Sequence, residues 1–227
     1  MPCNLGYKSY DAVRFPTPKP SQFKKKVSAP QPNSELLRLI GEEDEVFLEW
    51  LNSLDIKPLL AEALRRAMSK VKVPKSLNFS INIDGSLVMT SSYTNKKVKN
   101  DLELASQAVG DRYQMEILGV IAQLLGYKFI LYSNKNGALV LEGEKEQSGV
   151  NVNAYLKITK EPDGDGSLMF EHFRSPKERD VERAKLISLA QKMGIKISLG
   201  EHRESGKPIS ADAHHKHFLK EGEGSGS

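Results

Sequence analysis

Apolar residues recur every three or four positions between residues 34 and 73, which is the spacing of an amphipathic helix. A short first run ends near Gly41, a second covers residues 46–54, and a third begins at Pro58 and ends near Pro74. Proline is well tolerated in the first turn of a helix, so Pro58 marks a helix start. Residues 34–74 are therefore predicted to form a helical hairpin.

From residue 75 the period changes to two, the period of a half-buried strand. Apolar residues alternate over 77–83 and return over 87–90, on either side of an Asp84-Gly85 turn. Asn100 and Glu103 resemble a capping box at the start of a helix that reaches Gly126, with an interruption near Gly110. Strands over 127–132 and 138–141 follow. Residues 75–146 are thus predicted to form a β-β-α-β-β unit.

A similar order follows over residues 150–210. Strands are expected over 155–158 and 168–173, on either side of a turn at 163–166. Ser175-Pro176-Lys177-Glu178 is a helix-start signal, and the helix ends near Gly194. A last strand begins at 195 and is weakened by Pro208. This second unit is predicted to be β-β-α-β.

The two units also share short stretches of sequence. Residues 121–129 align with 189–197, and Gly85-Ser86-Leu87 aligns with Gly166-Ser167-Leu168. We interpret this as an internal repeat, although any amphipathic helix that ends in glycine and enters a strand looks similar. The predicted fold class is α+β with antiparallel sheet; the units can form one continuous sheet or two.

The basic residues of the chain are concentrated at its N-terminus. The formal net charge is +4, yet residues 1–33 alone carry six basic residues, one acidic residue and six of the eleven prolines. Proline disfavours regular structure, so we expect an extended basic arm, which is either a disordered solubilising tail or a segment that orders on an anionic partner. Residues 211–227 are expected to form a flexible tail.

Few residues fit a catalytic or metal site. The single cysteine, Cys3, lies in the proline-rich arm, and no glycine-rich phosphate loop follows a strand. His214, His215 and His217, together with Asp212 and His202, are the best metal candidates, but adjacent histidines in a flexible tail lack rigid support. We therefore predict no catalytic site, no metal site and no cofactor. No stretch is apolar enough to span a membrane, so we expect a cytoplasmic protein without a membrane partner.

Nucleic acid or another large partner is the main functional alternative. Tyrosines can stack on bases and lysines can pair with phosphates. Over 177–192 basic residues alternate with acidic ones, which is typical of a solvated helix surface. The predicted partner-binding residues are Tyr7, Lys8, Tyr10, Arg14, Lys24, Lys25, Lys26, Lys96, Lys97 and Lys99.

Residues 111–141 also resemble part of a known family. Asp111-Arg112-Tyr113 begins a helix that leads to Gly126-Tyr127-Lys128 and on to Gly137-Ala138-Leu139-Val140-Leu141. This segment resembles the C-terminal part of a group of small conserved plastid and bacterial proteins of unknown function. The resemblance implies a helix followed by a hairpin and implies no chemistry.

The sequence therefore favours a non-enzymatic cytosolic binding or assembly protein. Its basic arm and repeat surface would engage a larger partner, either a protein complex or structured RNA. The alternative is an enzyme with a pocket between the two α+β units that uses Asp111, Arg112, Tyr113 or His172. Binding of the arm to anionic lipid is less favoured, because a proline-rich segment forms no amphipathic helix.

Overall fold

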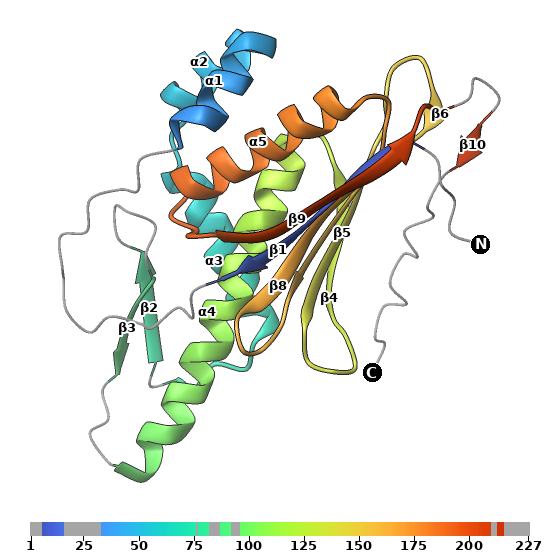
Figure 1. The fold of residues 1–227 in the computed structure, drawn as a ribbon. Helices are drawn as coiled ribbons and strands as arrows, with labels where there is room; N and C mark the ends of the chain where they lie inside the picture. Colours follow the sequence, from blue (N-terminus) through green and yellow to red (C-terminus); the bar gives the residue numbers. More distant parts are fainter. Residues whose placement is uncertain are drawn as a thin grey trace. The chain divides into compact units, whose positions relative to one another are not determined.

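The structure is a computed structural model that describes residues 6–15, 33–75, 77–81, 87–91, 96–209 and 213–215. Side chains are described for these residues except 91, 96–102, 214 and 215. Five helices and a large antiparallel sheet make up the described part of the chain (Figure 1), so the predicted α+β class is confirmed.

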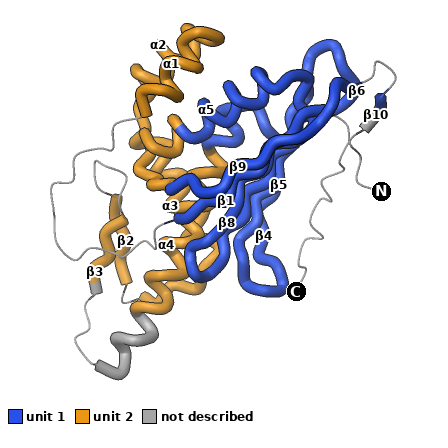
Figure 2. Tube along the Cα trace, in the orientation of Figure 1, with its two compact units in different colours: residues 1–15, 121–187, 198–227 blue, residues 16–120, 188–197 orange. Residues whose placement is uncertain are grey.

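The chain divides into two compact units (Figure 2). Unit 1 comprises residues 1–15, 121–187 and 198–227, and unit 2 comprises residues 16–120 and 188–197. These units cross the predicted boundaries, because the N-terminal segment joins the sheet of the C-terminal half.

Unit 2 contains three short helices where a helical hairpin was predicted. They are α1 (Ser34–Glu43), α2 (Glu45–Ser53) and α3 (Lys57–Lys70). Asp44 separates the first two, because its carboxylate accepts a hydrogen bond from the Phe47 backbone N–H at 2.9 Å and caps α2. At the other end of α2, Lys192 Nζ donates to the backbone carbonyls of Leu51 and Asn52, which lie in the last turn of the helix.

Unit 2 also holds the first predicted hairpin and most of a long helix. Strands β2 (Leu77–Ile81) and β3 (Leu87–Ser91) pair antiparallel as predicted, while the Asp84-Gly85 turn lies outside the described residues. Helix α4 spans Lys96–Leu124 without interruption. The predicted start at Asn100 and the break near Gly110 are therefore wrong: the helix begins earlier, and Gly110 is tolerated in its interior.

Unit 1 is built on a six-stranded antiparallel sheet in the order β4-β5-β7-β8-β1-β9. Its strands are β4 (Lys128–Ser133), β5 (Leu139–Lys145), β7 (Ala154–Lys160), β8 (Asp165–Phe173), β1 (Gly6–Arg14) and β9 (Ser198–Lys207). The predicted strands of the second and third hairpins are confirmed. Two-residue strands β6 (Asn151–Val152) and β10 (His214–His215) pair parallel, so residues 214–215 depart from the expected flexible tail.

Helix α5 (Pro176–Lys192) follows β8, and its residues 176–187 belong to unit 1. The Ser175 hydroxyl accepts a hydrogen bond from the Glu178 backbone N–H at 3.1 Å, as the helix-start signal predicted. Strands β8 and β9 are both antiparallel to β1, so they run parallel to each other and α5 is the crossover between them.

The N-terminal segment fills the one-strand gap that this crossover leaves. β1 pairs with β8 on one side and with β9 on the other. The expectation of a free arm over 1–33 is therefore wrong for Gly6–Arg14, which lies in the sheet interior. The proline-rich residues 16–32 lie outside the described residues.

The sheet face that α5 covers changes from apolar to polar across the strands. One cross-strand row runs through Leu141, Ile158 and Leu168, which are fully buried, and continues into Asp11 and His202. Strands β1 and β9 therefore bring polar side chains under the helix, and these side chains need hydrogen-bond partners there.

The predicted repeat stays a prediction. The order of elements recurs, but β2 and β3 form a separate two-stranded sheet, whereas β7 and β8 lie within the six-stranded sheet. Neither one continuous sheet nor two separate sheets describes all the predicted strands. The strands within 128–145 lie in the same sheet as those predicted over 150–210, and the strands within 77–91 do not.

Gly166 on β8 lies opposite Lys160 of β7 and has no room for a side chain. A Cβ atom there would lie 2.1 Å from the Thr159 carbonyl oxygen and 2.9 Å from Phe15 Cε2. Because the first atom belongs to the backbone, the strands must separate to admit a methyl group. We predict that Gly166→Ala lowers the free energy of unfolding by more than about 2 kcal/mol in urea denaturation. Ser167→Ala, one residue away, is the control and should change it by less than about 0.5 kcal/mol; equal effects would contradict the close packing.

Candidate partner-binding groove and its buried charge network

The sheet face opposite α5 holds a groove over strands β8, β1 and β9. Its volume is about 320 Å³, and it is lined by Lys8, Ser9, Tyr10, Met169, Glu171, Arg203 and Ser205. Tyr10 stands opposite Met169 on one side and opposite Arg203 on the other, so these three side chains form one cross-strand row. The Tyr10 side chain is solvent-exposed. The groove thus combines an aromatic ring, a thioether, two cations and one carboxylate.

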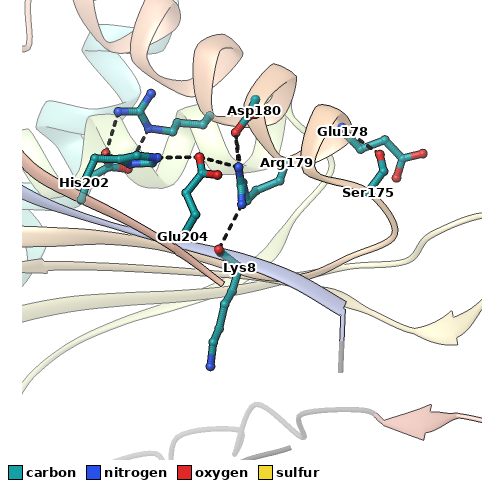
Figure 3. Close-up of polar contacts among 9 residues, drawn as sticks. Lys8, Ser175, Glu178, Arg179, Asp180, His202 and Glu204 are labelled. Atoms are coloured by element: carbon teal, nitrogen blue, oxygen red, sulfur yellow. Dashed lines mark hydrogen bonds and ion pairs between the residues drawn. The ribbon is translucent and has the colours of Figure 1, made fainter. Parts of the chain in front are cut away.

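The groove has one cation with no ion pair. Arg203 donates to both carboxylate oxygens of Glu201, at 2.7 and 2.9 Å. Lys8 has no ion-pair partner within the described residues, and Figure 3 shows its side chain pointing away from Arg179 and Glu204, toward the opposite side of the strand. Lys8 is therefore available to an anionic ligand on the open face.

The alternate residues of the same two strands form a charge network under α5. Asp11 is 1% exposed, and Arg183 donates to its two carboxylate oxygens at 2.7 and 2.6 Å. His202 Nδ1 lies 2.7 Å from the same carboxylate, and His202 Nε2 lies 2.7 Å from a Glu204 carboxylate oxygen. The network thus ties β1 to β9 and both strands to α5.

Arg179 extends the network to the backbone of β1. Its guanidinium lies 2.6 Å from Glu204 and 2.7 Å from Asp180, and Nη1 donates to the Lys8 carbonyl oxygen at 3.1 Å (Figure 3). Three cations and three carboxylates then alternate along the cluster, so each buried charge in it, on Asp11 and Arg179, faces opposite charges. Lys8, whose side chain lines the groove, is thus bound through its backbone carbonyl by Arg179 of α5 on the opposite face.

The geometry favours the protonated state of His202. Both ring nitrogens face carboxylate oxygens, which accept hydrogen bonds and cannot donate them when ionised. Each nitrogen can therefore make its contact only as a donor, so the two contacts favour the imidazolium form. In that state it has no lone pair with which to act as a general base.

The pKa shifts agree with this arrangement. Burial acts to lower the pKa of His202, but hydrogen bonds to Glu204 and Asp11 outweigh it and raise this pKa above its usual 6.5. Hydrogen bonds from His202 and Arg179 lower the pKa of Glu204 below its usual value.

Only part of the predicted partner-binding set comes together. Lys8 and Tyr10 line the groove. Tyr7 is half-buried on the same strand, and Arg14 lies 3.6 Å from Asp165 at the exposed end of β1. Lys24, Lys25 and Lys26 lie outside the described residues, and Lys96, Lys97 and Lys99 lie in the first turn of α4, where side chains are not described.

Sequence reasoning missed most of both sites. Met169, Glu171, Arg203 and Ser205 alternate with inward residues and look like an ordinary solvated strand face. The predicted solvated surface of the 177–192 helix is wrong for Arg179 and Arg183, whose side chains are 1% and 17% exposed. Their spacing of four residues was the available signal, because it places both on one helix face.

The residues of the enzyme alternative have structural partners. Arg112 pairs with Glu116 at 2.8 Å, and Asp111 accepts a hydrogen bond from Gln107. His172 is buried in unit 1 with a positive φ of 65°, at a bulge of β8, and its carbonyl accepts from Gln147 Nε2 at 2.8 Å. Among the described residues, no three His, Cys, Asp or Glu side chains form an arrangement suited to a metal ion. Cys3, Asp212 and His217 lie outside the described residues.

No protein-family model, curated protein or solved structure matches the chain. The resemblance of residues 111–141 to plastid and bacterial proteins therefore stays a prediction. Within the described residues, no helix has the length and apolar character needed to cross a lipid bilayer.

The network predicts that Asp11 is essential for stability. Asp11→Asn leaves the cations of Arg183 and His202 without the carboxylate between them, so we expect the free energy of unfolding to fall by about 3 kcal/mol in urea denaturation. Ser9→Ala is the matched control. Ser9 is also buried on β1, but its hydroxyl has no hydrogen-bond partner in the described part of the chain, so the loss should stay below about 1 kcal/mol. Comparable losses in the two variants would contradict the network.

A pH dependence follows from the raised pKa of His202. The ring contributes its full stabilisation below its unfolded pKa of 6.5 and loses it as pH rises through the higher pKa of the folded state. We therefore expect the free energy of unfolding to fall as pH increases above about 6.5, and His202→Gln to remove that fall. Urea denaturation in steps from pH 6 to pH 9 measures it. The same slope in wild type and variant would show that His202 is not the titrating group.

Proposed function

We propose that this chain is a non-enzymatic cytosolic binding or assembly protein that engages a larger partner with the open face of its six-stranded sheet. The partner is a protein complex or RNA. The observation that carries the proposal is the groove, where exposed Tyr10 lies opposite Arg203 and two residues from Lys8, which has no ion pair with a described residue, on a face that α5 does not cover. An exposed aromatic ring flanked by cations is typical of a recognition surface.

The chemistry of the opposite face supports binding over catalysis. The most concentrated group of titratable residues in unit 1 is the network of Asp11, His202 and Glu204 with its arginines, and its members bind one another. Its role is to hold β1 and β9 in register so that their alternate side chains form the groove. The enzyme alternative needs reactive groups that converge on a substrate, and the titratable side chains of this network are instead paired with one another.

The basic residues near Lys24 belong to the same proposal. They begin ten positions after the last residue of β1 in the sequence, and we propose that the same partner engages them. Deletion of residues 1–33 is not a suitable test, because it removes a strand from the interior of the sheet. Substitution of Lys24, Lys25 and Lys26 by glutamine removes the charge and keeps the strand.

Site-specific photocrosslinking tests the proposal. A benzophenone amino acid at position 10 should give a discrete high-mass adduct in cells that express the full chain, because the groove faces the partner. The same probe at Val46, which is 77% exposed on α2, is the control and should give none. Combining the probe at position 10 with Arg203→Glu should reduce the yield at least about threefold, since the pairing charge is reversed. Equal adducts from positions 10 and 46, or none from position 10, would contradict the proposal.

A further inference from the structure

We propose that the groove binds one unpaired nucleotide of an RNA, with its base stacked on Tyr10 and its phosphate paired with Lys8. This inference rests on the proposed function and names the partner class. It depends on four features of the groove: its aromatic side chain, its size, its cation without an ion pair and its carboxylate.

Tyr10 is an exposed aromatic residue of the groove. It is 37% exposed although it lies on an interior strand, because the neighbouring side chains on the open face do not fill the groove above the sheet. Met169 lies beside it as a polarisable apolar neighbour. Stacking of a base on an exposed tyrosine contributes substantially to the binding of single strands, because every base has a π face.

The size of the groove suits a single nucleotide. Its volume of about 320 Å³ is at the lower end of the range for small-molecule sites. A paired base cannot stack on Tyr10, because its two faces are covered by its neighbours in the helix. The groove therefore selects an unpaired base in a loop or single strand.

The cations suit a phosphate. Lys8 lies two residues before Tyr10, so both side chains project from the same face of β1. Arg203 is held by Glu201, but both side chains of this pair are more than half exposed, and such pairs are weak. A phosphate can thus bind Lys8 without displacing an ion-pair partner among the described residues, and it can attract Arg203 from its surface partner.

Glu171 distinguishes RNA from other anionic polymers. A carboxylate in a groove that binds phosphate is repulsive unless it meets a hydrogen-bond donor. The ribose 2′-hydroxyl is such a donor, and it is the group that separates RNA from DNA. Ser205 on the neighbouring strand can donate or accept in the same contact.

Fluorescence anisotropy with the full chain tests the inference. The probes are a 5′-labelled single-stranded RNA 10-mer of mixed sequence, the same RNA as a duplex, and single-stranded DNA of the same sequence. We expect single-stranded RNA to bind at least about fivefold tighter than the duplex and at least about threefold tighter than DNA. Equal affinity for the duplex or for DNA would overturn the assignment.

Variants place the binding in the groove. Tyr10→Ala should weaken binding of single-stranded RNA at least about fivefold, and Tyr10→Phe, which keeps the ring, should stay within about twofold. Tyr132→Ala is the matched control, because Tyr132 is 38% exposed on β4, four strand spacings or about 19 Å from β1. Lys8→Gln should reduce the slope of log affinity against log salt by about 0.7. Equal losses for Tyr10→Ala and Tyr132→Ala would overturn the proposal, and circular dichroism confirms that each variant folds.

The two proposals fail in different ways. If the probe at position 10 crosslinks a protein and no RNA binds, the nucleotide site is wrong and the binding function stands. If the probe at position 10 gives no adduct and no RNA binds, both are wrong.

Discussion

A buried carboxylate on the first strand is the constraint on which the rest of unit 1 depends. Asp11 lies in the row that begins with Leu141 and Ile158, where an unpaired charge would cost several kcal/mol. It is compensated by Arg183, which is 172 residues away in the sequence, and by His202. The charge of Asp11 is compensated only when α5 and β9 are both in place. Burial of β1 in the sheet therefore depends on segments from the other end of the sequence.

Strand alternation links this constraint to the groove. Asp11 and His202 point to α5, while their neighbours Tyr10 and Arg203 point to the open face. A slip of one residue in β1 would bury Tyr10 and expose Asp11, so the network fixes the register on which the groove depends. The polar cluster therefore determines how the groove side chains are placed, while its own side chains are paired with one another.

The sequence predicts the elements that have local signals. The hairpin strands, the cap at Ser175 and the glycine after α5 depend on residues close together in the chain, and they are confirmed. The start of α4 was misplaced because a capping signal at Asn100 competes with helical residues before it.

The place of β1 could not be predicted. Its inward residues are Ser9, Asp11 and Val13, of which only valine is apolar, and the prolines that follow favour an irregular segment. The partners that make this strand stable are contributed by α5 and β9, so no local pattern contains them. For the same reason Tyr10 and Lys8 could be chosen as binding candidates from residue type, but Arg203 and Glu171 could not.

Hydrogen–deuterium exchange of the full chain tests most directly whether β1 is an interior strand held by the network. We predict that backbone amides of residues 8–13 exchange as slowly as those of β7, because both strands are paired on two sides and open only when the sheet unfolds. Exchange of these amides at the rate of an unstructured peptide, while β7 stays protected, would contradict the account.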